Sequence, residues 1–170
     1  SGFTDLFGDL AKKVENFYVN RILSVLNEQW QEQIEKHPWN SEIVIHQQNF
    51  FEKLVRPLLK KKGKVFVVIS DALRYECALE LKEMVMQEDR YQAELMPMLG
   101  VLPSFTQLGM AALLPNKKLE LDKNAEKVLV DGQNSQGLEG RQKILQENFG
   151  KKAIAMHLKD FMKLNQEKGR

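Results

Sequence analysis

The sequence predicts an α/β protein with a mostly parallel central sheet and flanking helices, preceded by a long two-helix extension. Apolar residues recur every three or four positions from 3 to 36, a spacing typical of an amphipathic helix. Residues 65–69 (VFVVI) form a continuous apolar run of the kind buried on both faces in a parallel sheet. From there to the end, strand-like and helix-like segments alternate, which favours right-handed strand–helix–strand connections.

The composition of the 170-residue chain fits a folded globular domain, because 43% of the residues are hydrophobic and 28% are charged. The formal net charge is only +2, so bulk charge does not indicate nucleic-acid binding, although a local basic patch stays open. No apolar run reaches the roughly 20 residues needed to span a bilayer. The single Cys77 excludes an internal disulfide and fits a reducing compartment. We therefore expect a cytoplasmic protein with no membrane partner.

Two helices are expected at the start of the chain. The first covers about 3–36 and ends before Pro38, because proline disfavours helical geometry in the residue that precedes it. The second is expected over about 41–60, with Ser41 as its N-cap. Together they define a predicted helical extension, residues 1–62.

The α/β domain is predicted to occupy residues 63–170. After the apolar run at 65–69, its expected elements are a helix at 73–87, a strand at 91–98, a helix at 105–114, a strand at 127–130, a helix at 137–148, a strand at 151–156 and a helix at 158–167. This alternation predicts one doubly wound sheet with helices on both faces.

Asp71 directly follows the first predicted strand. In open α/β sheets, ligands gather at the carboxyl ends of the strands, and a carboxylate there can bind a divalent metal ion. Asp71 has an alternative role as a cap of the next helix, and its position alone favours that role because aspartate is a preferred N-cap residue.

A second candidate site lies in residues 102–115 (LPSFTQLGMAALLP). Ser104 and Gln107 have the spacing of a capping box, which predicts Ser104 as the helix N-cap and Thr106 as the second helical residue. The Thr106 hydroxyl would then lie among unpaired backbone N–H groups, which stabilise an anion. Threonine becomes a nucleophile only when a metal or a base removes its proton. The alternative is an ordinary threonine in a first helical turn.

Three motifs carry a further signal: VFVVISDALRYECALEL (65–81), LPSFTQLGMAALLP (102–115) and VLVDGQNSQGLEGRQKIL (128–145). Together they resemble the PglZ family of bacterial phage-defence proteins. SDALRYE combined with LPSFTQLGM is specific, whereas either alone is only suggestive. The resemblance covers nearly the whole chain.

The resemblance implies the alkaline phosphatase superfamily, in which two metal ions, usually zinc, lie at the carboxyl ends of a central sheet. By the match of motifs, Asp71 would ligate one metal ion and Thr106 would be the nucleophile. Residues 103–106 are similar to a P-T-x-T pattern, in which the second threonine attacks. Arg74 either faces a substrate phosphate as a bidentate donor or pairs with a nearby glutamate. Since PglZ proteins occur in the BREX defence system, the resemblance also implies a phosphoester substrate, with nucleic acid among the candidates, and other defence components as partners.

The chain departs from the superfamily in the remaining metal ligands. In the superfamily these ligands come from later strands. The histidines here, His37, His46 and His157, have no neighbouring Asp-His pair. Zinc sites normally use three or four protein ligands. We therefore expect the chain to be the N-terminal part of a metal-dependent phosphatase or phosphodiesterase domain, inactive in this form, with its downstream ligands outside the chain.

Two other interpretations of the function stay open, and so does the role of one turn. The first is a non-catalytic scaffold whose helical extension docks on other defence components, which exposed apolar positions on 3–60 would favour. The second is a receiver-like domain with Asp71 as phosphoacceptor. It ranks last, because only helices precede the first predicted strand. Asp131 and Gly132, at a predicted strand end, are either close to the site or a plain turn.

Overall fold

A computed structural model of the chain describes residues 2–122 and 127–167. The chain divides after Asn40 into two compact units. The predicted boundary between a helical extension (1–62) and an α/β domain (63–170) is a different division of the chain, and it stays a prediction.

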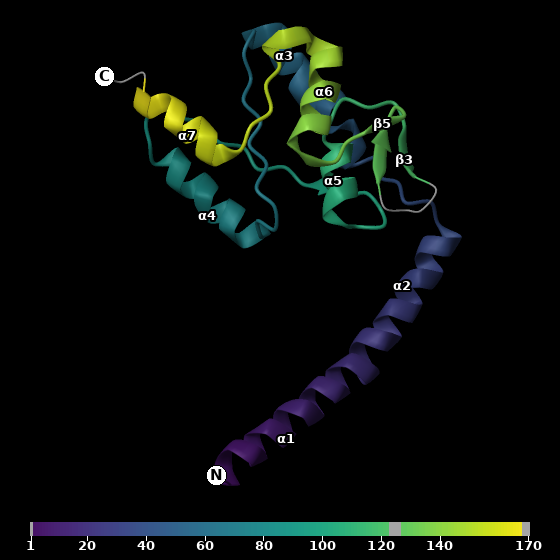
Figure 1. Ribbon diagram of the computed structural model, residues 1–170. Helices are drawn as coiled ribbons and strands as arrows, with labels where there is room; N and C mark the ends of the chain where they lie inside the picture. The colour runs from purple at the N-terminus through teal and green to yellow at the C-terminus, as the bar shows by residue number, and fades with distance from the viewer. Residues whose placement is uncertain (1, 123–126, 168–170) are drawn as a thin grey trace. The chain divides into compact units, whose positions relative to one another are not determined.

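The first unit is dominated by one continuous helix (Figure 1). It consists of α1 (Gly2–Phe17), the π-helical turn η1 (Tyr18–Leu23) and α2 (Ser24–Lys36). The backbone N–H of Ser24 donates to the carbonyl of Val19, five residues back, as in a π turn, and the Ser24 hydroxyl donates to the same carbonyl at 3.0 Å. The helix ends as predicted, because His37 is extended in front of Pro38.

The predicted helix at 41–60 begins later than expected, so that prediction is wrong in its first half. The chain forms strand β1 (Ile45–His46), the 3-10 turn η2 (Gln47–Asn49), the π turn η3 (Phe51–Val55) and helix α3 (Arg56–Lys62). Ser41 is not a helix N-cap: its hydroxyl accepts hydrogen bonds from the backbone N–H groups of Ile43 and Val44, both at 3.2 Å. These bonds build a turn that leads into β1.

Strand pairing is limited, and the mostly parallel central sheet is only partly evident. β1 pairs in parallel with β2 (Met98–Leu99), with Ile45 opposite Met98. A separate antiparallel sheet has the order β3 (Leu119–Leu121), β4 (Val128–Val130) and β5 (Gln133–Asn134). Of the predicted strands, the one at 127–130 is confirmed by β4, and only the end of the one at 91–98 is a strand.

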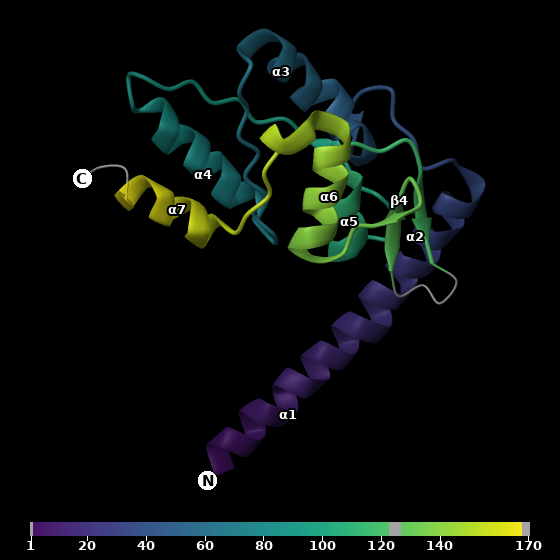
Figure 2. The same ribbon diagram turned by 45° about the horizontal axis from the view of Figure 1, so that its top comes forward.

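The strands predicted at 65–69 and 151–156 are wrong for different reasons. Residues 65–69 run between α3 and α4 (Tyr75–Met86) as a stretched segment with no neighbouring strand in the described parts of the chain (Figures 1 and 2). The second segment pairs with a side chain instead of a strand. The Gln142 amide donates to the carbonyl of Ala153 at 2.7 Å and accepts from the N–H of Ala155, so one glutamine pairs with two of the backbone groups that a neighbouring strand would have paired.

The later helices lie close to their predicted positions. They are α4 (Tyr75–Met86), α5 (Thr106–Ala112), α6 (Gly137–Phe149), the 3-10 turn η4 (Gly150–Lys152) and α7 (Leu158–Glu167). α4 and α7 lie side by side in both views (Figures 1 and 2). Within the described ranges, no helix combines the length and the apolar character that crossing a membrane demands.

The buried core of the second unit joins α5, β4 and α6. Its members are Leu108, Ala111, Leu114, Val128, Val130 and Ile144. The buried hydroxyl of Ser135 donates to the carbonyl of Val128 at 2.8 Å. Close to this bond α6 approaches the chain so tightly that a Cβ atom on Gly140 would lie 2.6 Å from the carbonyl oxygen of Asn134. Only glycine fits this approach without a shift of the backbone.

Candidate functional site

Asp71 lies in the turn between the stretched segment and α4, where the following Ala72 adopts a left-handed conformation with φ 56°. Its side chain is exposed. The capping alternative for Asp71 is wrong, because α4 takes Arg74 as its N-cap and has no side-chain cap hydrogen bond. The carboxylate therefore remains open to solvent.

Arg74 is exposed at the start of α4 in an extended conformation. Sequence reasoning left a salt bridge to a glutamate as one alternative for this residue. Among the described residues, no ion pair involves Arg74. Its guanidinium is therefore open for an anionic partner, and the role of substrate binding stays a prediction.

Thr106 is the first residue of α5, and its side chain is exposed. The predicted capping box is wrong: the N-cap is Phe105, with φ −139°, and no side chain caps the helix. The helix begins one residue later than the capping box requires, so Ser104 lies outside the N-cap position. Gln107 instead accepts a hydrogen bond from the side-chain amide of Gln136 at 3.2 Å, which ties α5 to the segment before α6.

Gln47 holds the loop that leads to Thr106. Its Oε1 accepts a hydrogen bond from the N–H of Val101 at 3.2 Å, and its Nε2 donates to the carbonyl of Gly109 at 3.1 Å. A Cβ atom on Gly109 would come within 3.4 Å of that Nε2, so the small residue lets the amide approach α5. Sequence reasoning missed Gln47, because a glutamine after a short apolar segment gives no local signal of a contact so distant in sequence.

Asp131 has a structural role, which confirms the plain-turn interpretation. It adopts a left-handed conformation with φ 50°. Its carboxylate accepts hydrogen bonds from the backbone N–H groups of Lys117 at 3.0 Å and Lys118 at 2.8 Å, while its own N–H donates to the Lys118 carbonyl at 2.9 Å. The carboxylate therefore fastens the start of β3 to the end of β4.

The described residues do not form a zinc site by themselves. Among them, no three or more His, Cys, Asp or Glu side chains converge in a group that could hold a metal ion. The His46 ring is used locally, because its Nε2 accepts the N–H of Ser41 at 3.1 Å. Zinc sites normally need three or four protein ligands, so Asp71 alone does not fit the ion. The roles of Asp71 as a metal ligand and of Thr106 as the nucleophile stay predictions.

The class of protein is shown by comparison with known families: the chain matches an alkaline phosphatase-like domain. Residues 50–170 match the family described as the BREX system PglZ alkaline phosphatase-like domain. The chain belongs to this PglZ family.

Two curated proteins are similar to the chain over most of its length. It is 42% identical over 164 residues to the alkaline phosphatase-like protein BrxZ of Escherichia coli O9:H4 (strain HS), covering 92% of this chain and 19% of that protein. It is 38% identical over 169 residues to the alkaline phosphatase-like protein PglZ of Bacillus cereus (strain H3081.97), covering 98% of this chain and 20% of that protein. The chain thus spans about one fifth of the length of these relatives. No solved structure matches it significantly.

Proposed function

We propose that this chain is the N-terminal part of the catalytic domain of a metal-dependent phosphoester hydrolase that acts in a BREX phage-defence system. The observation that carries this proposal is the family match over residues 50–170, a range that contains Asp71, Arg74 and Thr106. All three side chains are exposed, so none needs a rearrangement of the core to meet a substrate. The complete domain in this proposal has a mostly parallel central sheet.

The proposed reaction is a two-step phosphoryl transfer. The Thr106 oxygen loses its proton and bonds to phosphorus as the leaving-group oxygen departs and takes up a proton. Water then hydrolyses the phosphothreonine and releases phosphate from a phosphomonoester substrate, or a phosphomonoester from a phosphodiester substrate. Arg74 orients the phosphoryl oxygens, because its planar guanidinium binds two of them at once. Asp71 would be one ligand of a divalent ion, with zinc as the proposed metal, and such an ion would supply Lewis-acid chemistry at the phosphoryl group.

The remaining ligands of two metal ions would come from polypeptide outside this chain, so the chain alone is proposed to be inactive. The substrate is a phosphomonoester or a phosphodiester, and a nucleic acid fits the second class. Other BREX components are the proposed protein partners, and the cytoplasm is the proposed compartment.

The test uses the full-length protein with Thr106→Ala, Thr106→Ser and Asp71→Ala made separately. We expect the two alanine variants to lose phosphoesterase turnover and Thr106→Ser to retain part of it, because serine keeps the nucleophilic oxygen. Metal content, measured on the same samples, should fall mainly in Asp71→Ala. Wild-type turnover in both alanine variants, with unchanged metal content, would disprove the assigned roles.

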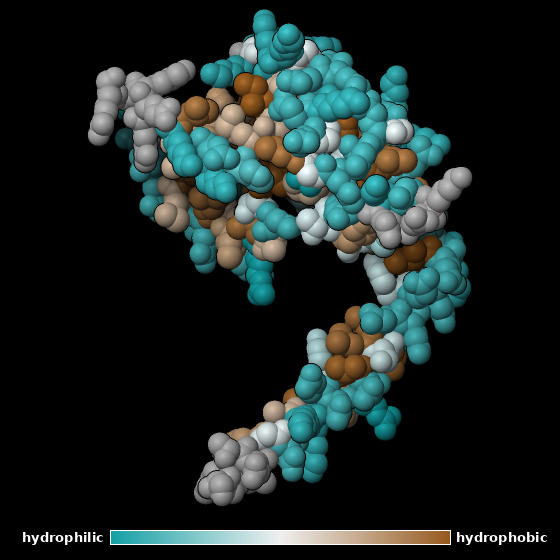
Figure 3. Space-filling model, in the orientation of Figure 1, coloured by the Kyte–Doolittle hydropathy of each residue, from teal (hydrophilic) through white to brown (hydrophobic). Residues whose placement is uncertain are grey.

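A scaffold role is the second candidate, and the exposed apolar surface of the first unit favours it. Hydrophobic surface interrupts the hydrophilic surface along this helix (Figure 3). The exposed fractions of Phe7, Leu10, Val14 and Phe17, spaced by three and four residues, are 63%, 56%, 61% and 63%. Such a stripe is the surface by which an amphipathic helix docks into a partner.

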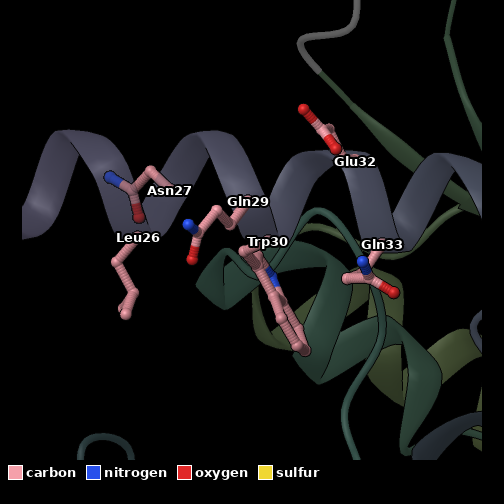
Figure 4. Close-up of a pocket in the computed structure, with 6 residues that line it drawn as sticks. All are labelled: Leu26, Asn27, Gln29, Trp30, Glu32 and Gln33. Atoms are coloured by element: carbon pink, nitrogen blue, oxygen red, sulfur yellow. The ribbon is translucent and has the colours of Figure 1, made fainter.

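Farther along the same helix, a shallow groove adds to this surface (Figure 4). Leu26 and Trp30 project from one side of the helix, whereas Glu32 projects from the other. If the scaffold role is correct, Val14→Asp in the full-length protein should abolish co-purification with other BREX components and leave phosphoesterase turnover unchanged. Exchange of an already charged residue, Lys12→Glu, serves as the control.

A further inference from the structure

Gln47 lies at the carboxyl end of the parallel strand pair. It directly follows β1, and the loop that leads to Thr106 directly follows β2. Because the two strands run in parallel, with His46 opposite Leu99, both of these ends lie at the same edge. In open α/β sheets, the carboxyl ends of the strands form the edge at which ligands bind.

The Gln47 amide holds the chain on both sides of Thr106. Its Oε1 accepts the N–H of Val101, five residues before Thr106, at 3.2 Å, and its Nε2 donates to the carbonyl of Gly109, three residues after it, at 3.1 Å. Gly109 also closes the first turn of α5, because its N–H donates to the carbonyl of Phe105 at 3.0 Å. A primary amide carries an acceptor and a donor in one group, so it can fasten both the entrance of the loop and the first turn of the helix. The Gln47 side chain is half-buried, and both contacts lie within the second unit.

We propose that Gln47 is a positioning residue for the phosphoryl transfer, which places the Thr106 hydroxyl through the backbone without touching the substrate. This inference rests on the proposed function, in which the Thr106 oxygen is the nucleophile. A misplacement of about 1 Å between reacting groups costs on the order of 10²-fold in rate. Loss of the Gln47 hydrogen bonds frees the chain on either side of Thr106, so it should lower kcat more than it weakens substrate binding.

Asn116 offers a matched comparison at the opposite end of α5. Its side-chain amide donates to three carbonyls, those of Gln48 at 3.2 Å, Ala112 at 3.3 Å and Leu114 at 2.7 Å. Like Gln47, it therefore joins α5 to the turn η2, but it does so beyond the last residue of the helix, whereas Thr106 is the first. A change at Asn116 should loosen the packing of α5 without releasing the loop that carries Thr106.

The kinetic test compares variants of the full-length protein, with zinc and bis-nitrophenyl phosphate. Gln47→Met keeps the length of the side chain and removes both hydrogen bonds, so kcat should fall about 10- to 100-fold while KM stays within about twofold. Gln47→Glu keeps the acceptor for Val101 but loses the donor to Gly109, so its kcat should fall as well. Asn116→Ala should lower the unfolding temperature at least as much as Gln47→Met does, yet keep kcat within about twofold of the wild type.

Hydrogen exchange provides a readout that does not depend on turnover. The N–H of Val101 should exchange about tenfold faster in Gln47→Met than in the wild type, because its acceptor is gone. It should stay protected in Gln47→Glu, which retains the acceptor, and in Asn116→Ala. Mass spectrometry of peptides that contain Val101, taken from the same full-length variants, measures this rate.

Two outcomes would overturn the positioning role. The first is a wild-type kcat in Gln47→Met while Thr106→Ala, measured alongside, is inactive; the proposed function would then stand, and Gln47 would be structural. The second is an equal loss of kcat in Gln47→Met and Asn116→Ala, which would assign the loss to general destabilisation. Wild-type turnover in Thr106→Ala would instead disprove the proposed nucleophile, and the positioning role with it.

Discussion

The side-chain amide of Gln47 donates a hydrogen bond to the carbonyl of Gly109 at 3.1 Å, across 62 residues of sequence. Its oxygen accepts the N–H of Val101, so one glutamine joins the end of β1 to both sides of the loop that carries Thr106. The start of α5, where the predicted nucleophile lies, is therefore positioned from a distant part of the chain.

Gln47→Ala should destabilise the second unit by about 1–2 kcal/mol, because it leaves a partly buried N–H and a partly buried carbonyl without partners. Urea denaturation followed by circular dichroism measures this loss. The matched control is Gln48→Ala, whose side chain is exposed and whose carbonyl, which accepts from Asn116, remains. Equal stability of the two variants would contradict the role assigned to Gln47.

Two glycine substitutions should have effects of opposite sign. Gly140→Ala should destabilise the protein by about 1–3 kcal/mol, because its Cβ would meet the carbonyl of Asn134 at 2.6 Å. Gly8→Ala should instead stabilise the long helix by about 1 kcal/mol, since no atom lies within 4 Å of the added Cβ and alanine favours helix. Thermal unfolding of both variants, followed by circular dichroism, measures the two changes in stability. A neutral Gly140→Ala would show that α6 can shift at little cost.

Asp131→Ala should cost about 1–2 kcal/mol, because the two N–H groups of Lys117 and Lys118 lose their acceptor and alanine disfavours the left-handed conformation. Asp131→Asn should cost less, since asparagine keeps a side-chain oxygen and tolerates that conformation. Urea unfolding of both variants at neutral pH measures the difference. Equal losses in the two variants, both of which lack the carboxylate charge, would show that the charge rather than the geometry matters most.

The Glu52–Arg56 ion pair predicts a pH dependence of stability. Hydrogen bonding to Arg56, at 2.5 and 2.7 Å, lowers the pKa of the Glu52 carboxyl below its ordinary 4.5. Because the folded-state pKa is depressed, the pair contributes stability above pH 4.5, and that contribution is lost as the pH falls through the lowered pKa.

Glu52→Gln should therefore lose stability less steeply than the wild type when the pH is lowered from 6 to about 3. Added salt should reduce the difference, since both side chains are partly exposed. Urea unfolding at each pH provides the measurement. The Arg56 guanidinium also lies 5.3 Å from the centroid of the Phe149 ring, so the NMR signals of that ring should follow the same titration.

The isolated chain should bind zinc weakly and should not hydrolyse bis-nitrophenyl phosphate when zinc is supplied. The reason is that no group of three potential ligands converges among the described residues. Equilibrium dialysis and release of nitrophenolate are the two readouts, with the full-length protein as the positive control. Appreciable turnover by the chain alone would show that its ligand set is complete.

The family could be predicted from the sequence because each of its motifs is a short continuous stretch of residues. SDALRYE and LPSFTQLGM each occupy one short stretch, and the match over residues 50–170 confirms what they indicate. The helical periodicity that predicts 3–36, 137–148 and 158–167 is equally local, since each helix satisfies its own backbone. The structure accordingly has helices at those positions.

Only the tertiary structure decided where strands and functional loops form, because a strand needs a backbone partner that can be far away in sequence or absent. The apolar run at 65–69 has every local property of a buried strand and yet remains open, whereas Gln142 replaces a neighbouring strand at Ala153 and Ala155. The start of α5 likewise depends on Gln47, which no local pattern links to Thr106. Local composition thus determined helices and family, and long-range pairing determined the rest.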